Sequence, residues 1–146
     1  MNEDWLGALS DWLESKDFVR SGEREDEGFG NILVQFKRAD CEVHALRERG
    51  EWFISLTPPG GTPSMGPYVW RHYLDSINPD QFLRPDTLEE QLDFVYGRLG
   101  EVVAAIGRDK GIGSRLRAIN RVIVSRRLGV DPVTLKRKEP SEGEGK

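Results

Sequence analysis

The stretch that decides the fold reads GNILVQFK at residues 30–37 and CEVHALRERGEWFISLTP at residues 41–58. Apolar and polar residues alternate in its first part, where Ile32, Val34 and Phe36 share one face of an extended chain. This period of two is typical of a half-buried β-strand. The whole stretch therefore predicts three short antiparallel strands.

The second part of this stretch predicts a hairpin that turns at Arg49 and Gly50. A two-residue turn at this point pairs Arg47 with Trp52, Ala45 with Ile54 and Val43 with Leu56, and on the opposite face Leu46 with Phe53, His44 with Ser55 and Glu42 with Thr57. Gly50 supplies the positive φ that such a turn needs, but Arg49 is a poor residue for the first position of a type I′ turn. A three-residue turn with Gly50 in a bulge is the alternative, and it would shift the register by one residue.

The composition excludes several classes of protein. The chain has 146 residues, of which 32% are charged. No apolar run approaches the roughly 18 to 20 residues that span a bilayer, and the first residues, MNEDW, are acidic where a secretory signal would be basic. We therefore expect a cytoplasmic protein that does not bind membranes. A single cysteine, Cys41, excludes an internal disulfide and a metal site built from several cysteines.

Charge is distributed unevenly along the chain. Residues 1–106 carry a net charge of −10, whereas residues 107–138 carry a net charge of +8. This asymmetry predicts an acidic body with a basic C-terminal segment, which either docks on the body or binds elsewhere. We expect one domain over residues 1–130 that ends in a basic helix. Residues 131–146 are poor in apolar side chains and are predicted to be mostly disordered.

Helical periodicity predicts four helices around the sheet. They cover residues 3–15, a short segment that begins at Tyr68, the segment that follows Pro85, and residues 114–128. The third helix begins with a capping box, formed either by Asp86 with Glu89 or by Thr87 with Glu90. The pattern as a whole indicates an α+β fold, in which one small antiparallel sheet of about three strands is packed by helices mainly on one face.

An acidic run, SGEREDEG at residues 21–28, lies between the first helix and the predicted sheet. Because it is polar and bounded by glycines, it is predicted to be a loop. Such a loop is either only solvated or a surface that meets a basic partner.

No catalytic or metal-binding motif is visible in the sequence. Cys41 and His44 are three residues apart on a predicted strand, so their side chains point to opposite faces and cannot form a thiol–base pair. No His-x-x-x-His or Cys-x-x-Cys spacing is present. Nothing selects two of the 25 carboxylates as an acid–base pair, so an enzyme hypothesis has no named residues. We expect no catalytic residues, no metal and no cofactor.

The basic segment suggests one possible function, which is binding to nucleic acid or ribonucleoprotein. Ten lysines and arginines within residues 107–138 could neutralise phosphates. The candidate contacts are Arg115, Arg117, Arg121, Arg126 and Arg127. Aromatic residues are absent from this segment, so bases could not stack on it.

The order of parts suggests another function through a resemblance. A tryptophan-bearing first helix is followed by FGNILVQF at residues 29–36, LRERGEWF at residues 46–53 and a capped helix that begins TLEEQ at residue 87. Over residues 3–106 this arrangement resembles small bacterial immunity-type proteins of polymorphic or contact-dependent toxin systems. The resemblance implies a non-enzymatic cytosolic protein that binds and blocks a toxin domain.

Charge is compatible with such a function, because an acidic body attracts a basic partner. The candidate partner contacts are acidic residues in the predicted loop together with residues of the hairpin turn: Glu23, Glu25, Asp26, Glu27, Glu48, Arg49 and Glu51.

Overall fold

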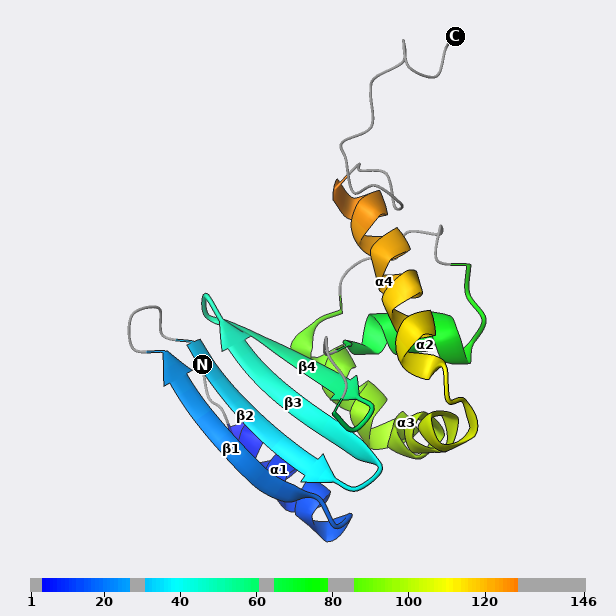
Figure 1. Cartoon of the computed structure of the whole chain (residues 1–146). Helices are drawn as coiled ribbons and strands as arrows, with labels where there is room; N and C mark the ends of the chain where they lie inside the picture. The colour runs from blue at the N-terminus through cyan, green and yellow to red at the C-terminus, as the bar shows by residue number, and fades with distance from the viewer. Residues whose placement is uncertain (1–3, 27–30, 61–64, 79–85, 129–146) are drawn as a thin grey trace, which may run out of the picture.

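The computed structural model describes residues 4–26, 31–60, 65–78 and 86–128. Within these ranges the chain forms an α+β fold with four helices and one antiparallel sheet, whose strand order β1-β2-β3-β4 follows the chain (Figure 1). The elements are α1 (Asp4–Ser15), β1 (Val19–Asp26), β2 (Asn31–Arg38), β3 (Cys41–Glu48), β4 (Glu51–Thr57), α2 (Pro67–Leu74), α3 (Leu88–Arg108) and α4 (Ile112–Leu128). The predicted fold class is confirmed, and the sheet has one strand more than the three expected.

The additional strand is β1. The prediction of a loop from residue 21 is wrong, because the chain from Val19 to Asp26 pairs antiparallel with β2, with a register shift between Arg20 and Gly22. Glu27 and Gly28, the end of the predicted loop, lie outside the described ranges. Strand β1 is an edge strand with a neighbour on one side only. Edge positions tolerate charged residues better than central strands do.

The hairpin between β3 and β4 has the predicted register. Glu48 is opposite Glu51, so Arg49 and Gly50 alone form the turn, and the alternative with a bulge is excluded. Both turn residues have positive φ, 53° for Arg49 and 82° for Gly50, as a type I′ turn requires.

One face of the sheet carries the core. Two rows of apolar side chains cross β2, β3 and β4 in register and are at most 1% exposed; they are Val34, Ala45 and Ile54 in one row and Phe36, Val43 and Leu56 in the other. Leu9 and Leu13 of α1 and Val95 of α3 belong to the same core and are fully buried. In Figure 1, α1 lies along the β1–β2 half of the sheet and α3 lies beside β4. We call the other face of the sheet, which carries Phe53, the open face.

Helix α3 begins where its capping box places it. The Thr87 hydroxyl accepts a hydrogen bond from Glu90 N at 3.1 Å, and the Glu90 carboxylate accepts one from Thr87 N at 2.9 Å. Of the two capping boxes that the sequence offered, the pair Thr87 and Glu90 is therefore the one that forms.

Helix α2 packs against both strand β4 and helix α4. Its Trp70 is fully buried, and the indole Nε1 donates a hydrogen bond to Leu56 O at 2.8 Å. Helix α4 packs against α2 and contributes the fully buried Leu116 to the core. The basic C-terminal helix is thus part of the folded body as far as Leu128, where the described part of the chain ends.

Candidate protein-binding surface

The two groups of candidate partner contacts approach each other at one end of the sheet. Strand β1 ends at Asp26, which is opposite Asn31, the first residue of β2. The Asn31 side-chain oxygen accepts a hydrogen bond from Arg49 N in the β3–β4 turn at 3.4 Å. The end of β1 and this turn therefore lie at the same end of the sheet, as Figure 1 also shows. We call this region the acidic end.

The turn residues of the acidic end are accessible. Glu48, Arg49 and Glu51 are all exposed. The two glutamates face each other across β3 and β4, so two like charges are held at adjacent positions. Like charges in such a pair destabilise a hairpin slightly, and an oppositely charged partner would relieve the repulsion.

The acidic residues of the predicted loop at residues 21–28 lie, as far as Asp26, on strand β1. Backbone pairing places Glu23 opposite Val34 and Glu25 opposite Ile32 on β2. Asp26 closes the strand, whereas Glu27 lies outside the described ranges. The structure therefore brings Glu25 and Asp26 toward the turn, and it fixes the backbone that carries them.

The outer edge of β4 is covered by a side chain from α3. The Gln91 side-chain oxygen accepts a hydrogen bond from Ile54 N at 2.7 Å, and its Nε2 donates to Trp52 O at 3.4 Å and to Asp86 O at 3.5 Å. Gln91 is only 6% exposed. A primary amide has the donor and acceptor of a backbone unit, so this side chain bonds to β4 as a short neighbouring strand would.

The candidate nucleic-acid contacts lie on α4. Arg115, Arg117 and Arg121 are exposed, whereas the side chains of Arg126 and Arg127 lie outside the described part of this helix. Helix α4 packs on α2, and its buried residues Ile112, Leu116 and Ile123 belong to the core. The basic helix therefore docks on the body through its apolar residues.

One arginine of α4 pairs with the loop that precedes the helix. Arg115 forms an ion pair with the Asp109 carboxylate, which also accepts a hydrogen bond from the Tyr73 hydroxyl at 2.7 Å. The bond from Tyr73, together with that from Arg115, lowers the pKa of Asp109. Part of the positive charge of α4 is therefore compensated locally.

Cys41 and His44, the side chains considered for chemical reactivity, lie in surroundings typical of structural residues. Cys41 is fully buried, and this burial raises the pKa of its thiol to about 12, so the nucleophilic thiolate is scarce at neutral pH. The His44 Nε2 lies 3.1 Å from a Glu42 carboxylate oxygen, and both residues belong to the face opposite to Cys41, as predicted. Burial raises the pKa of Glu42, but hydrogen bonds from Gly60 N and His44 outweigh it and hold that pKa below its ordinary value.

Among the described residues, no group of three or more histidines, cysteines and carboxylates is arranged to hold a metal ion. None of the described helices is both long and apolar enough to cross a membrane.

Sequence reasoning missed the contribution of the open face. The row formed by Leu33, Leu46 and Phe53 crosses three strands next to the acidic end, and Phe53 is 46% exposed. The pairing of Leu46 with Phe53 was predicted from the hairpin register, and this apolar pair on the face opposite the core was the available signal. Comparison with known protein families, with curated proteins and with solved structures found no match.

Proposed function

We propose that the chain is a non-enzymatic protein-binding domain of the bacterial cytoplasm whose acidic end docks on a basic partner. We further propose that this partner is a toxin domain, which the protein neutralises as an immunity protein. The proposal rests on one observation. The end of β1 and the β3–β4 turn lie at the same end of the sheet, and Glu48 and Glu51 beside the turn are exposed. A concentration of one charge on a rigid sheet end speeds the encounter with an oppositely charged surface.

The test begins with affinity capture from the native cell lysate at low and moderate salt, with and without nuclease treatment, followed by mass spectrometry. The expected result is one stoichiometric protein that remains bound after nuclease treatment. The association rate of that protein is then measured with Glu48→Lys and Glu51→Lys in separate variants. Each should reduce the association rate at low salt by about threefold to tenfold, because a rim charge acts mainly on encounter.

Asp11→Lys is the matched control. Asp11 is an exposed carboxylate on α1, and its replacement changes the net charge by the same amount. Equal loss of association rate in this control and in the two turn variants would show that only total charge matters, and it would refute a role for the acidic end.

A second candidate function, binding of nucleic acid, is favoured by the exposure of Arg115, Arg117 and Arg121 on one helix. Deletion of residues 108–146 is unsuitable as its test, because it would remove the fully buried Leu116 from the core. Arg117→Ala and Arg121→Ala are better, since each would remove one phosphate contact and lower the slope of log affinity against log salt by about one. Captured nucleic acid that disappears with nuclease would favour this function over the first.

A further inference from the structure

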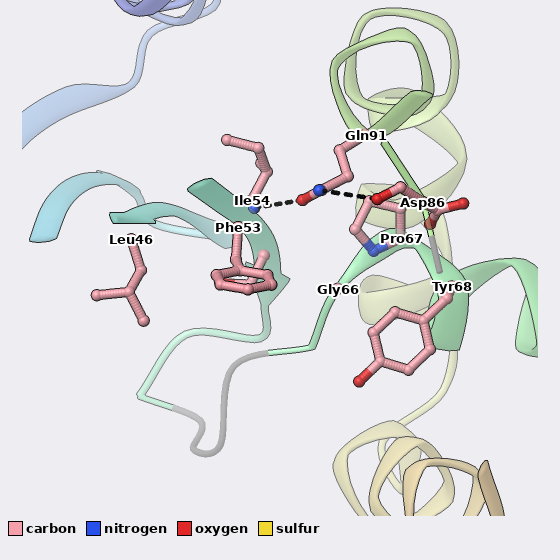
Figure 2. Close-up of a pocket in the computed structure, with 9 residues that line it drawn as sticks. Leu46, Phe53, Ile54, Gly66, Pro67, Tyr68, Asp86 and Gln91 are labelled. Carbon is pink, nitrogen blue, oxygen red and sulfur yellow. Dashed lines mark hydrogen bonds between the residues drawn. The ribbon is translucent and has the colours of Figure 1, made fainter. Parts of the chain in front are cut away.

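A cleft of about 220 Å³ lies where the open face of the sheet meets the start of α2 (Figure 2). Leu46, Phe53 and Ser55 line it from the sheet, and Pro67 and Tyr68 line it from the helix. Its lining is mainly apolar. We call it the β4 cleft.

The β4 cleft continues toward the acidic end. A second cavity of about 300 Å³ shares Phe53, Asp86 and Gln91 with it and is also lined by Gly50 and Glu51 of the turn. A bound chain could therefore contact Glu51 of the turn and the β4 cleft at the same time.

The size of the β4 cleft indicates what can enter it. Sites for small molecules and cofactors usually enclose about 300 to 1,000 Å³. Without the adjoining cavity, the β4 cleft of about 220 Å³ falls below this range, and it suits a single large side chain. Phe53, 46% exposed, already presents an aromatic surface there, and such residues are typical of the centre of protein interfaces.

Tyr68 lines one side of the β4 cleft, and contacts within the chain hold its ring in place. Its hydroxyl donates a hydrogen bond to the Asn120 side-chain oxygen of α4 at 3.0 Å. The ring lies so close to Gly66 that a Cβ added there would be 2.9 Å from Tyr68 Cε1. A glycine is therefore required for this ring position, and a wall held in place reduces the entropy lost on binding.

The occupant cannot bind by adding a strand to β4. Ile54 N already donates to Gln91, Leu56 N donates to Met65 O at 2.8 Å, and Leu56 O accepts from Trp70 Nε1. With these outward groups bonded within the chain, an extended peptide would find few free backbone partners along β4. Binding in the cleft must therefore rely on a side chain.

We propose that the β4 cleft receives one aromatic or large aliphatic side chain of a protein partner, and that lysines or arginines flank this side chain. The flanking charges follow from Glu51, which lines the adjoining cavity, and from Glu48, which lies opposite Glu51 on β3, so the inference rests on the proposed function and specifies its partner. A buried aromatic anchor surrounded by complementary charge is the arrangement in which a few residues carry most of the binding energy.

The test uses three five-residue peptides and the full chain labelled with ¹⁵N. One peptide has a central tryptophan flanked by lysines, one has alanine in place of the tryptophan, and one has the tryptophan flanked by serines. The lysine–tryptophan peptide should shift the amide signals of Ile54, Ser55 and Tyr68. It should bind about tenfold more tightly than either other peptide, since it alone combines apolar burial with charge.

Two variants change the cleft in different ways. Phe53→Ala removes half-exposed apolar surface, and Gly66→Ala displaces the Tyr68 ring. Each should weaken the lysine–tryptophan peptide about tenfold and leave the lysine–alanine peptide unchanged. Val19→Ala is the matched control, because Val19 is 66% exposed on the opposite edge strand.

The outcomes separate the two proposals. If both lysine peptides bind equally and shift only the signals of the turn, the β4 cleft is not an anchor site, while the acidic end still attracts basic partners. Equally tight binding of the serine–tryptophan peptide would overturn the requirement for flanking charge. Absence of any shift at Ile54, Ser55 and Tyr68 would overturn the inference as a whole.

Discussion

Replacement of Gln91 by methionine should destabilise the protein although the new side chain is similar in size and apolar. In the native structure Gln91 bonds to Ile54 N at 2.7 Å and is almost completely buried. Methionine cannot accept this hydrogen bond, so a buried backbone N–H would lose its partner. A buried donor left without a partner costs about 1 to 3 kcal/mol, whereas a swap that conserves volume costs less than about 1.5 kcal/mol. We therefore expect Gln91→Met to lower the free energy of unfolding by about 2 kcal/mol.

Urea denaturation monitored by tryptophan fluorescence measures this loss. With a slope of about 2 kcal/mol per molar urea, the midpoint should fall by about 1 M while the slope stays constant. Hydrogen exchange of the Ile54 amide should become faster than that of amides in the centre of the sheet. The matched control is Gln35→Met, because Gln35 lies on β2, whose backbone is paired by β1 and β3 on its two sides. A midpoint shift no larger than that of the control would refute the role assigned to Gln91.

The pH dependence of Gln91→Glu tests the same contact in another way. A carboxylate at residue 91 can still accept a hydrogen bond from Ile54 N. It would, however, be buried close to the backbone carbonyl oxygens of Trp52 and Asp86, which accept hydrogen bonds from Gln91 Nε2 in the native protein. Burial and the nearby oxygens should raise its folded pKa above the unfolded value of about 4.3. The stability of this variant relative to the native protein should therefore fall as pH rises from about 4 toward that raised pKa. A relative stability that is constant with pH would contradict this placement of the side chain.

Three further predictions concern single contacts. Thr87→Ala removes the cap on Glu90 N and should cost about 1 kcal/mol in urea denaturation, and no measurable loss would disprove its capping role. Arg49→Asn should stabilise the protein by roughly 1 kcal/mol, because Arg49 has a φ of 53° that asparagine adopts more easily, and a lower urea midpoint would contradict this. Arg98 donates two hydrogen bonds to the Asp75 carboxylate, at 2.7 and 2.9 Å, which lower the pKa of Asp75, and Asp75→Asn removes the negative charge and one of the two accepting oxygens. In pH-dependent denaturation the stability lost by this variant should be present at pH 7 and disappear as pH falls through that lowered pKa, and a loss that persists in acid would exclude the ion pair as its cause.

The parts of the fold that the sequence predicts are those set by neighbouring residues. The hairpin register follows from the alternation on both sides of Gly50, and the start of α3 follows from the spacing of Thr87 and Glu90. Each of these signals lies within a few residues of the structure that it specifies. Strand β1 could not be found in this way, because its residues, VRSGERED, show no apolar alternation. It forms by pairing with β2, and an edge position tolerates its charges.

The candidate surface was predictable only in part for the same reason. Glu48 and Glu51 follow directly from the turn and are exposed as expected of a turn. Their approach to the end of β1 depends on the pairing of β1 with β2, which the sequence did not reveal. The β4 cleft depends on contacts that are more distant still, since Gln91 and Ile54 are 37 residues apart and Tyr68 and Asn120 are 52 residues apart. Local sequence patterns cannot predict contacts between residues that are so far apart in the chain.

The two edges of the sheet limit how a partner can bind. The outer edge of β4 is bonded to Gln91, Met65 and Trp70, and that of β1 carries many charged residues and a register shift, features that discourage pairing with another strand. Recognition at this sheet must therefore depend on side chains, which the acidic end and the β4 cleft provide next to each other. Charge at the acidic end would govern the rate of encounter, whereas burial in the cleft would govern the rate of dissociation. Substitutions at Glu51 and at Phe53 in the same complex should then affect different rate constants, and a shared effect on association alone would mean that the cleft stays empty in the complex.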